Sequence, residues 1–391
     1  MELFIGEDYE SDEEEYISAQ RARSVLICGK RGTGKSYTLG NIIEEIHTET
    51  YDIVPLVVDP MGIYWTMANR NTEQEELLWD WGLSPEEFPV NLLIPGDPEK
   101  RYGSEVVAEL DRVGINVDSL RLNPSDMSPN DWCSLFDLNI NKPMGIALYR
   151  AVRNLSDEDD ETQEKFFLDD IINEVEMDGG AGDRTKEALI NRLEMAKRWD
   201  IFGDEYEDIW STVDSNRVNV LDLSVVDPGQ YGLRNLVVDV LSRNIFRQRS
   251  DARRREEMGL EVDVPKVWMF IDEAHNFIPS GQSSLAKDTL VRWVKEGRQP
   301  GLSMVVASQQ PSAIDSEVLS QCDTILCHKI TTREDVKSLN KLSQDYMGSG
   351  LKTYVRQIDN VGEAVHVDDD EETVKMIKVR PRKSQHGGGE A

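Results

Sequence analysis

The sequence has few basic residues, few cysteines and no long apolar run. Lysine and arginine together number 43, against 74 aspartates and glutamates, which gives a formal charge of −31. Because contacts to phosphate need Lys and Arg, such a balance usually argues against nucleic acid as a partner. A local basic channel can nevertheless coexist with an acidic exterior. We interpret acidity spread over most of the chain as a surface suited to high salt, as in cytosolic proteins of salt-loving archaea.

Cysteines, histidines and apolar runs are too sparse for a disulfide-rich protein, a Cys/His metal-binding protein or a membrane-spanning protein. The four cysteines form no C-x-x-C pair and the five histidines show no metal-ligand spacing, so we expect buried, reduced thiols. No apolar run approaches the ~20 residues that cross a bilayer. Residues 1–5 are too short for the core of a signal peptide. We therefore expect a soluble, cytoplasmic protein without a membrane span.

A complete phosphate-binding loop, G-x-x-x-x-G-K-S, is the most informative motif. An apolar run at 25–28 precedes it, and residues 37–46 follow with helical spacing, which is the strand–loop–helix context that the motif requires. Its backbone N–H groups and the helix N-terminus favour phosphate. A glycine-rich turn that binds nothing is the plain alternative. The residues predicted to bind ATP are Gly29, Lys30, Arg31, Gly32, Thr33, Gly34, Lys35, Ser36 and Tyr37.

A second motif, an apolar strand at 267–271 followed by Asp272 and Glu273, has the form of a Walker B sequence. Buried parallel strands deliver side chains at their carboxyl ends, where α/β sheets bind ligands. We expect Asp272 and Ser36 to hold Mg²⁺, Lys35 to reach the β- and γ-phosphates, and Glu273 to act as general base on the attacking water. A pair of helix-capping acids is the alternative.

Gln309 and Arg298 complete the predicted catalytic residues. Gln309 follows the apolar run 303–307 and can contact the γ-phosphate or the attacking water, whereas Gln310 is left open. Arg298 precedes that run and can stabilise developing charge, often across a subunit boundary, or be a surface arginine in a turn. Asp59, at the end of the run 53–58, is expected to support the site.

An arginine cluster between 243 and 255 stands out against the acidic background. It can follow a DNA backbone, or it can be a solvated helix end or pair with an acidic neighbour, and the last two explanations are slightly preferred.

Apolar strands that alternate with helices predict the fold class α/β, with a parallel sheet covered by helices on both faces. Pro55 suggests that its strand is an edge strand or irregular. The predicted organisation is an acidic N-terminal arm that is flexible or a short β-like segment, a core in two parts, a mainly helical insertion between them, and a glycine-rich, mobile tail. The boundaries are 1–23, 24–120, 121–210, 211–370 and 371–391.

Five stretches together resemble the HerA–FtsK superfamily of DNA-pumping ATPases, archaeal HerA in particular. They are 27–36, 59–62, 221–224, 271–277 and the long run 296–322. The resemblance extends over roughly residues 24 to 385. It implies a RecA-like core that assembles as a homo-hexamer and hydrolyses ATP with Mg²⁺ at subunit interfaces to drive DNA through a pore.

The resemblance also implies roles for single residues. Lys35 and Ser36 would be the Walker A pair, Asp272 and Glu273 the Walker B pair, Gln309 the γ-phosphate sensor and Arg298 a finger acting in trans. His275 matches the pattern without an assigned role. Ile63 replaces the acidic residue that many members have after Gly62, so a contact made by that acidic side chain is not expected here.

HerA members carry an N-terminal β-barrel, whereas 23 residues precede the first predicted core strand here. Contacts made through a barrel, including those to a nuclease partner of the NurA type, therefore do not carry over directly. We expect a DNA translocase or helicase acting as a ring motor on duplex DNA, with genome packaging and conjugative transfer as related alternatives. A nucleotide-dependent switch or scaffold that moves no DNA is an alternative of another class, and a membrane-associated pump is a third.

Overall fold

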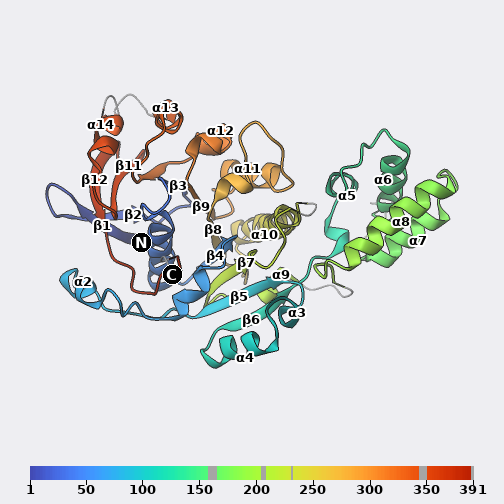
Figure 1. The fold of residues 1–391 in the computed structure, drawn as a ribbon, viewed down its shortest axis with the longest axis horizontal. Coiled ribbons are helices and arrows are strands. Elements are labelled where there is room, and N and C mark those ends of the chain that lie inside the picture. Colours follow the sequence, from blue (N-terminus) through green and yellow to red (C-terminus); the bar gives the residue numbers. More distant parts are fainter. Residues whose placement is uncertain (157–164, 204–207, 230–231, 343–349, 389–391) are drawn as a thin grey trace.

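In the computed structural model, twelve strands form one sheet across the described residues, which are 1–156, 165–203, 208–229, 232–342 and 350–388. From β10 to β6 neighbouring strands are parallel, and β11, β12, β1 and β2 extend one edge in antiparallel order (Figure 1). The parallel strands, in sheet order, are β10 (Thr324–Cys327), β3 (Ser24–Cys28), β9 (Leu302–Ser308), β8 (Lys266–Ile271), β4 (Ile53–Asp59), β7 (Val218–Asp222), β5 (Val90–Pro95) and β6 (Asn116–Leu120). The antiparallel strands are β11 (Glu363–Asp368), β12 (Thr373–Val379), β1 (Glu2–Asp8) and β2 (Glu14–Ser18).

Helices cover both faces of this sheet, so the predicted α/β fold class is confirmed. In β3, Val25 and Ile27 face one apolar cluster while Leu26 and Cys28 face the other, as expected for a strand buried on both sides. The first cluster is completed by α1 (Lys35–Glu49), η1 (Tyr64–Ala68) and α4 (Ser104–Arg112). The second includes α10 (Leu233–Glu257), α11 (Lys287–Glu296), α12 (Ser316–Leu319), α13 (Arg333–Leu342) and α14 (Gly350–Gln357). Short elements at loops are α2 (Glu75–Asp80), α3 (Pro98–Tyr102), η3 (Ala274–Asn276) and η4 (Pro311–Ala313).

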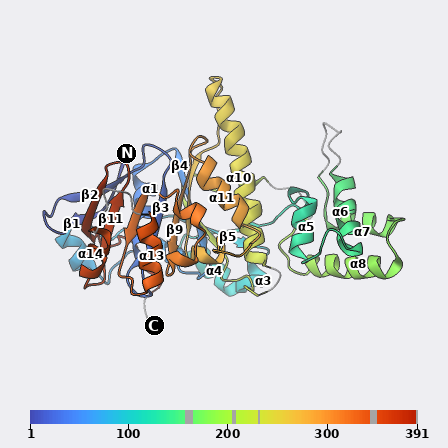
Figure 2. The same ribbon diagram turned by 90° about the horizontal axis from the view of Figure 1, so that it is seen from above.

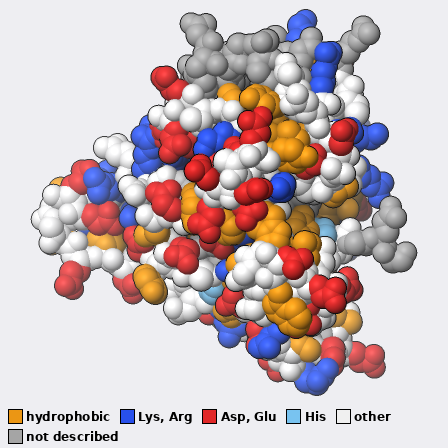
Figure 3. Space-filling model, turned by 90° about the vertical axis from the view of Figure 1, so that its left-hand side faces the viewer, with side chains coloured by type: hydrophobic (Ala, Val, Ile, Leu, Met, Phe, Trp, Pro, Cys, Tyr) orange, Lys and Arg blue, Asp and Glu red, His pale blue; other side chains and the backbone are white. Residues whose placement is uncertain are grey.

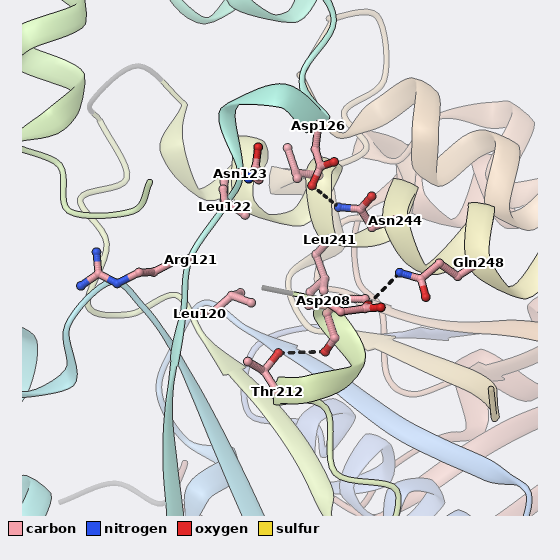
Figure 4. A pocket seen from close by; sticks show the side chains of 12 residues that line it. Leu120, Arg121, Leu122, Asn123, Asp126, Asp208, Thr212, Leu241, Asn244 and Gln248 are labelled. Carbon is pink, nitrogen blue, oxygen red and sulfur yellow. Dashed lines mark hydrogen bonds between the residues drawn. The ribbon is translucent and has the colours of Figure 1, made fainter. Parts of the chain in front are cut away.

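Most of the described part of residues 121–210, predicted to be mainly helical, forms a lobe beside the sheet (Figure 1). The lobe contains α5 (Pro129–Leu135), α6 (Pro143–Leu155), α7 (Leu168–Met177) and α8 (Asp183–Lys197), while η2 (Pro124–Asp126) and α9 (Ile209–Thr212) lie where the chain enters and leaves it. Where it joins α10, Asp126 accepts a hydrogen bond from Asn244 at 3.0 Å and Asp208 accepts one from Gln248 at 2.9 Å (Figure 4). The cavity between them measures about 20 Å³, which is space for a water molecule and not for a nucleotide.

Pro55 was expected to mark an edge strand or an irregular one, and the edge-strand alternative is wrong. Strand β4 lies between β8 and β7, and Pro55 is buried. The Pro55 carbonyl faces β7, where it lies 3.5 Å from the Asn219 side-chain amide, and the β4–β7 pairing begins only at Leu56. In a strand, the N–H and the C=O of one residue point to the same side. The N–H that Pro55 lacks would therefore point toward β7 before the β4–β7 pairing begins, so no hydrogen bond of the sheet is lost.

Both chain ends contribute strands to the sheet: the arm predicted to be flexible or a short β-like segment forms β1 and β2, and residues 373–379 of the predicted tail region form β12. Strand β1 pairs with β2 on one side and with β12 on the other. In β2, Glu15 is 7% exposed and is paired with Lys375 and, at 3.3 Å, with His366. One member of the acidic run, Glu15, is thus buried, and its partners lie some 350 residues away in the chain. Residues 389–391 of the expected tail lie outside the described residues.

A buried ionic cluster fixes the segment after β12 to helix α1. Glu44 is fully buried and accepts hydrogen bonds from Arg380 at 3.0 Å and from the Ser384 backbone and hydroxyl at 2.9 and 2.6 Å. Burial acts to raise the pKa of Glu44, but Arg380, Arg382 and the Ser384 bonds outweigh it and hold that pKa below its usual value. Since α1 begins in the phosphate-binding loop, the cluster couples the chain end to that loop.

We expect Glu44→Ala to lower the free energy of unfolding by about 3–5 kcal/mol at pH 7, because it leaves the buried Arg382 without its acid and the buried Arg380 with only Glu45. The measurement is equilibrium denaturation of both chains. The contribution of a carboxylate with a lowered pKa is complete above the ordinary pKa of glutamate and is lost as the pH falls through the folded-state value. The gap between wild type and variant should therefore shrink in acid.

The matched control for this change is Glu49→Ala on the same helix, where the side chain is exposed. It should change stability by less than about 0.5 kcal/mol. Equal effects of the two substitutions would contradict the assigned role of the cluster.

Candidate active site

Three adjacent strands bring the predicted site residues to one edge of the sheet. Strand β9 lies between β3 and β8, and all three are parallel. The phosphate-binding loop follows β3, Gln309 follows β9, and Asp272 and Glu273 follow β8. Because parallel strands end at the same edge, residues far apart in the sequence surround one site.

The phosphate-binding loop has the backbone that its glycines permit. Gly34, directly before α1, has φ 106°, in the left-handed region that favours glycine. At Gly29 a Cβ atom would lie 2.7 Å from the His328 Cβ, so the close approach of β10 excludes a larger residue. Lys35 is buried and its Nζ donates to the Lys30 carbonyl at 3.2 Å. Lys30 and Arg31 are exposed at the tip of the loop.

Lys35 lies within electrostatic reach of the acidic pair after β8. Burial lowers the pKa of Lys35, while Glu273 and Asp272 act in the opposite direction. The Walker A lysine and the Walker B acids therefore share one site, as their order in the sheet requires.

Tyr64, which was not predicted as a site residue, connects the two motifs. Its hydroxyl donates to Asp272 Oδ2 at 3.0 Å and lies 3.4 Å from the Ser36 carbonyl oxygen. Asp272 is 1% exposed, and its Oδ1 accepts from the Glu273 N–H at 2.8 Å. Ser36 and Asp272, the predicted magnesium ligands, thus adjoin the same phenol group. Hydroxyl and carboxylate oxygens are donors that suit Mg²⁺.

Asp59 holds the turn that positions Tyr64. Its two carboxylate oxygens accept from the backbone N–H groups of Met61, Gly62, Ile63 and Tyr64 at 3.0, 2.8, 2.7 and 2.9 Å. Burial, with the nearby Asp222, raises the pKa of Asp59 to about 7, while the bonds from Tyr64, Met61 and Ile63 act against it. The spacing of five residues between a strand-terminal aspartate and a tyrosine is the signal in the sequence from which Tyr64 could have been found.

Glu273, the predicted general base, has an unusual backbone conformation and one carboxylate oxygen without a hydrogen-bond partner among the described residues. Its backbone has φ 48°, a left-handed conformation that is unusual for a non-glycine residue. Its Oε1 accepts a hydrogen bond from the Gln309 amide. Its Oε2 is buried and, among the described residues, has no hydrogen-bond partner, although His275 Nδ1 lies 3.4 Å away. A buried carboxylate oxygen with free lone pairs is suited to take a proton from water. Gln310 is exposed beyond the pair.

His328 fixes the first turn of α1 from the other side. Burial lowers its pKa to about 4, so the ring is neutral. Its Nδ1 lies 2.9 Å from the Glu363 carbonyl and must donate to it, which leaves Nε2 to accept from the Thr38 hydroxyl at 2.9 Å. Sequence reasoning missed this residue because a lone histidine after a strand carries no local pattern.

Arg298 is the predicted site residue that the structure does not bring to the others. It precedes β9, whereas the phosphate-binding loop follows the parallel strand β3. The seven residues of β9 separate the two edges by about 20 Å at 3.3 Å per residue. Arg298 is exposed and lines a surface groove with residues of α10 and α11. Within one chain it does not reach the phosphate-binding loop.

The arginine cluster on α10 is largely paired within the chain, although that helix extends beyond the sheet (Figure 2). Arg249 is 1% exposed and donates to the Pro300 and Val264 carbonyls. Arg243 pairs with Asp131 at 2.7 Å, and Arg253 with Glu257 at 3.1 Å. These contacts favour a structural role for those three side chains.

Comparisons with known proteins agree with this geometry. The model of the family described as "Helicase HerA, central domain" matches residues 3–245. The HerA double-strand break repair helicase of Saccharolobus solfataricus is 27% identical over 269 residues, which are 64% of this chain and 52% of that protein. The HerA protein of Sulfolobus acidocaldarius is 24% identical over 68% of this chain and 55% of its own length. The chain thus spans about half the length of these curated relatives.

Among solved structures, VirB4 of Thermoanaerobacter pseudethanolicus aligns with a TM-score of 0.57 at 13% identity, covering 97% of this chain and 96% of that one. At this identity the likeness concerns the fold, and it confirms the predicted RecA-like P-loop architecture. Among the described residues, no helix has the length and apolar character needed to cross a bilayer.

We expect Asp59→Asn to lower the free energy of unfolding by about 2–4 kcal/mol at pH 8, where the wild-type carboxyl is ionised. The amide NH₂ that replaces one oxygen cannot accept from two of the four N–H groups, and each buried unpaired donor costs about 1–3 kcal/mol. Denaturation curves measure the loss, and hydrogen exchange at residues 61–64 should accelerate.

Asp52→Asn is the control, since Asp52 forms a surface pair with Lys266 at 2.7 Å and its side chain is 55% exposed. It should cost less than about 1 kcal/mol. Unchanged exchange at residues 61–64 in Asp59→Asn would show that the aspartate does not hold this turn.

Proposed function

The chain belongs to the family of the HerA helicase central domain, and from that premise we propose that it hydrolyses ATP and uses the energy as a ring-forming translocase or helicase on duplex DNA. One observation carries the catalytic part of the proposal. Glu273, with a free buried oxygen and an amide contact to Gln309, lies at the same sheet edge as a complete phosphate-binding loop. This arrangement suits in-line attack of water on a terminal phosphate.

In the proposed mechanism, loop N–H groups from Gly29 to Ser36 hold the phosphates and Lys35 contacts the β- and γ-phosphates. Ser36 and Asp272 would hold Mg²⁺, which supplies charge neutralisation for the phosphates. Glu273 takes the proton of the attacking water, and Gln309 orients Glu273 and senses the γ-phosphate. Tyr64 keeps Asp272 turned toward Ser36.

The names of the relatives support DNA as the substrate, and the position of Arg298 supports assembly as a ring. The two HerA relatives are named as DNA double-strand break repair helicases, which supports DNA as the substrate here. Arg298 lies at the opposite edge of the sheet from its own phosphate-binding loop, so a catalytic role for it requires a neighbouring copy of the chain. We place it as a finger acting across the interfaces of a homo-hexamer. A nuclease partner stays a prediction that comes from the family resemblance alone.

Glu273→Gln should bind ATP as tightly as wild type but lose turnover by about 10²–10⁴-fold, because the amide cannot accept a proton. The measurement is phosphate release in high salt, with and without duplex DNA, beside equilibrium binding of ATP. Wild type should turn over faster with duplex DNA, and the exposed Glu261→Gln change should match wild type.

Turnover that persists in Glu273→Gln would refute the assigned general base. Slow wild-type turnover that ignores DNA would instead favour the nucleotide-dependent switch.

For Arg298, we expect that Arg298→Ala binds ATP but loses most of its turnover, since a finger arginine contributes about 10³–10⁵-fold in related phosphoryl transfer. Mixing Arg298→Ala with Glu273→Gln should restore activity. In mixed rings, some interfaces combine the intact Arg298 of one chain with the intact Glu273 of the next.

No restored activity in a mixture that native mass spectrometry shows to be co-assembled would rule out action in trans. A monomeric, ATP-bound chain would contradict the ring itself.

A further inference from the structure

His275 contacts the predicted general base, and the mechanism proposed above gives it no role. It lies in η3, the short helix directly after Glu273. Its Nδ1 atom lies 3.4 Å from Glu273 Oε2 and 3.4 Å from the hydroxyl oxygen of Ser308. Ser308 ends β9, which pairs with β8, so the ring lies where two neighbouring parallel strands end.

The oxygen of Glu273 that is suited to take a proton from water has no direct contact through which to release it. Oε2 is buried and has no hydrogen-bond partner among the described residues. Oε1 accepts from the amide of Gln309, which cannot take up a proton. After each hydrolysis the neutral carboxyl group must lose its proton before it can activate another water molecule. The cycle therefore needs a base next to Oε2, and His275 Nδ1 is a base in that position.

We propose that His275 receives the proton of the attacking water from Glu273 and passes it to solvent, an inference that rests on the proposed function and completes its proton transfer. The oxygen of the water bonds to the γ-phosphorus, while the bond from that phosphorus to the bridging oxygen breaks and ADP leaves with the electron pair. The proton lost by the water goes to Glu273 Oε2 and then to His275 Nδ1. Because His275 acts through Glu273, it is a positioning residue for the base.

Ser308 orients the imidazole ring for this role. The Ser308 side chain is fully buried, and its hydroxyl oxygen accepts from the Gln310 N–H at 3.1 Å. The hydroxyl hydrogen is then available to His275 Nδ1. A neutral ring that accepts at Nδ1 carries its own hydrogen on Nε2, so we infer the tautomer whose lone pair lies beside Glu273. When Glu273 becomes protonated, its O–H can donate to the same lone pair.

The ring also gives the proton a route to water. The His275 side chain is 30% exposed, compared with 15% for Glu273. Glu273 is the carboxylate within ion-pair distance of the ring, and the other charged groups of the site are Asp272 at the end of β8 and Lys35 at the start of α1. The recovered carboxylate of Glu273 therefore balances the positive charge on the imidazolium until water removes the proton.

Histidine is the side chain whose charge changes near neutral pH, which suits it to take a proton from a carboxyl group and return it to water. The chain has five histidines. On the face beside β1, β2 and β12, few histidine side chains appear among the acidic, basic and hydrophobic ones (Figure 3). His328 is already bonded at both ring nitrogens, and His366 faces Glu15. His275 is thus the histidine that the fold places at the predicted general base.

The test compares ATP turnover and ATP binding in wild type and His275→Ala. The variant should bind ATP with unchanged affinity but turn over at least roughly tenfold more slowly, because Glu273 loses its proton acceptor. Added imidazole should restore part of the turnover in proportion to its concentration. Pyrazole, a ring of the same size and much weaker basicity, should not. Wild-type turnover should fall in acid as the ring becomes protonated, and in His275→Ala this fall should begin at a lower pH.

His275→Asn is the second variant, because its amide can form hydrogen bonds to Glu273 and Ser308 but cannot carry a proton. It should be as slow as His275→Ala. Wild-type turnover in His275→Asn would overturn the proton transfer, and so would equal rescue of His275→Ala by imidazole and pyrazole. The matched control is His47→Asn in the last turn of α1, at the far end of that helix from Lys35, which should turn over as wild type does.

Failure of this inference can be distinguished from failure of the proposed function. Wild type that hydrolyses no ATP would overturn the proposed function, and the proton transfer with it. Wild type that hydrolyses ATP no faster than His275→Ala at every pH would overturn the role of His275 alone.

Discussion

Parallel pairing of β10, β3, β9 and β8 is the constraint on which the site depends. Cys28 is opposite Cys327 on one side and Ser308 on the other, and Ile271 is opposite Val306. The strands thus end within two residues of one another. His328, the phosphate-binding loop, Gln309 and Asp272 leave the sheet at one level, and hydrogen bonds within the ladder set their spacing. A slip of one residue in any strand would move its polar residue along the edge and invert its buried faces.

The antiparallel edge has a less obvious part in the same site. Strands β11 and β12 return the chain beside β10, and the segment that follows is fixed to α1 by Glu44, Arg380 and Ser384. That segment places Arg382 and the ring of His386 against Tyr37. Residues near both ends of the chain therefore support the helix that begins at Lys35. Loosening this edge would affect nucleotide binding even though none of its strands carries a catalytic group.

The sequence was sufficient where a motif is local and insufficient where a partner is distant. The phosphate-binding loop and the acids after β8 were predicted because each is a short pattern next to an apolar strand, and the α/β fold followed from strands that alternate with helices. His328 was missed because it acts through contacts with residues far along the chain, whereas Tyr64 was missed although its spacing from Asp59 was a local signal. Pro55 was misjudged because composition does not show which side of a strand its missing N–H faces. Glu15 was taken for part of a solvated acidic run because its partners, Lys375 and His366, lie at the other end of the chain.

The charge of the site connects these features to the proposed chemistry. Asp59, Asp222 and Asp272 are each at most 2% exposed at this edge, while Lys35 is the buried cation among the described residues of the phosphate-binding loop. A triphosphate adds further negative charge to a region of low dielectric constant, where like charges repel strongly. Lys35 alone does not balance that charge, which supports the divalent cation that we propose at Ser36 and Asp272. In the transition state of hydrolysis, negative charge is spread over the transferred phosphoryl group and the leaving oxygen, which makes a guanidinium from outside the chain advantageous. The excess of acid is therefore a physical reason for a site completed at an interface between copies of the chain.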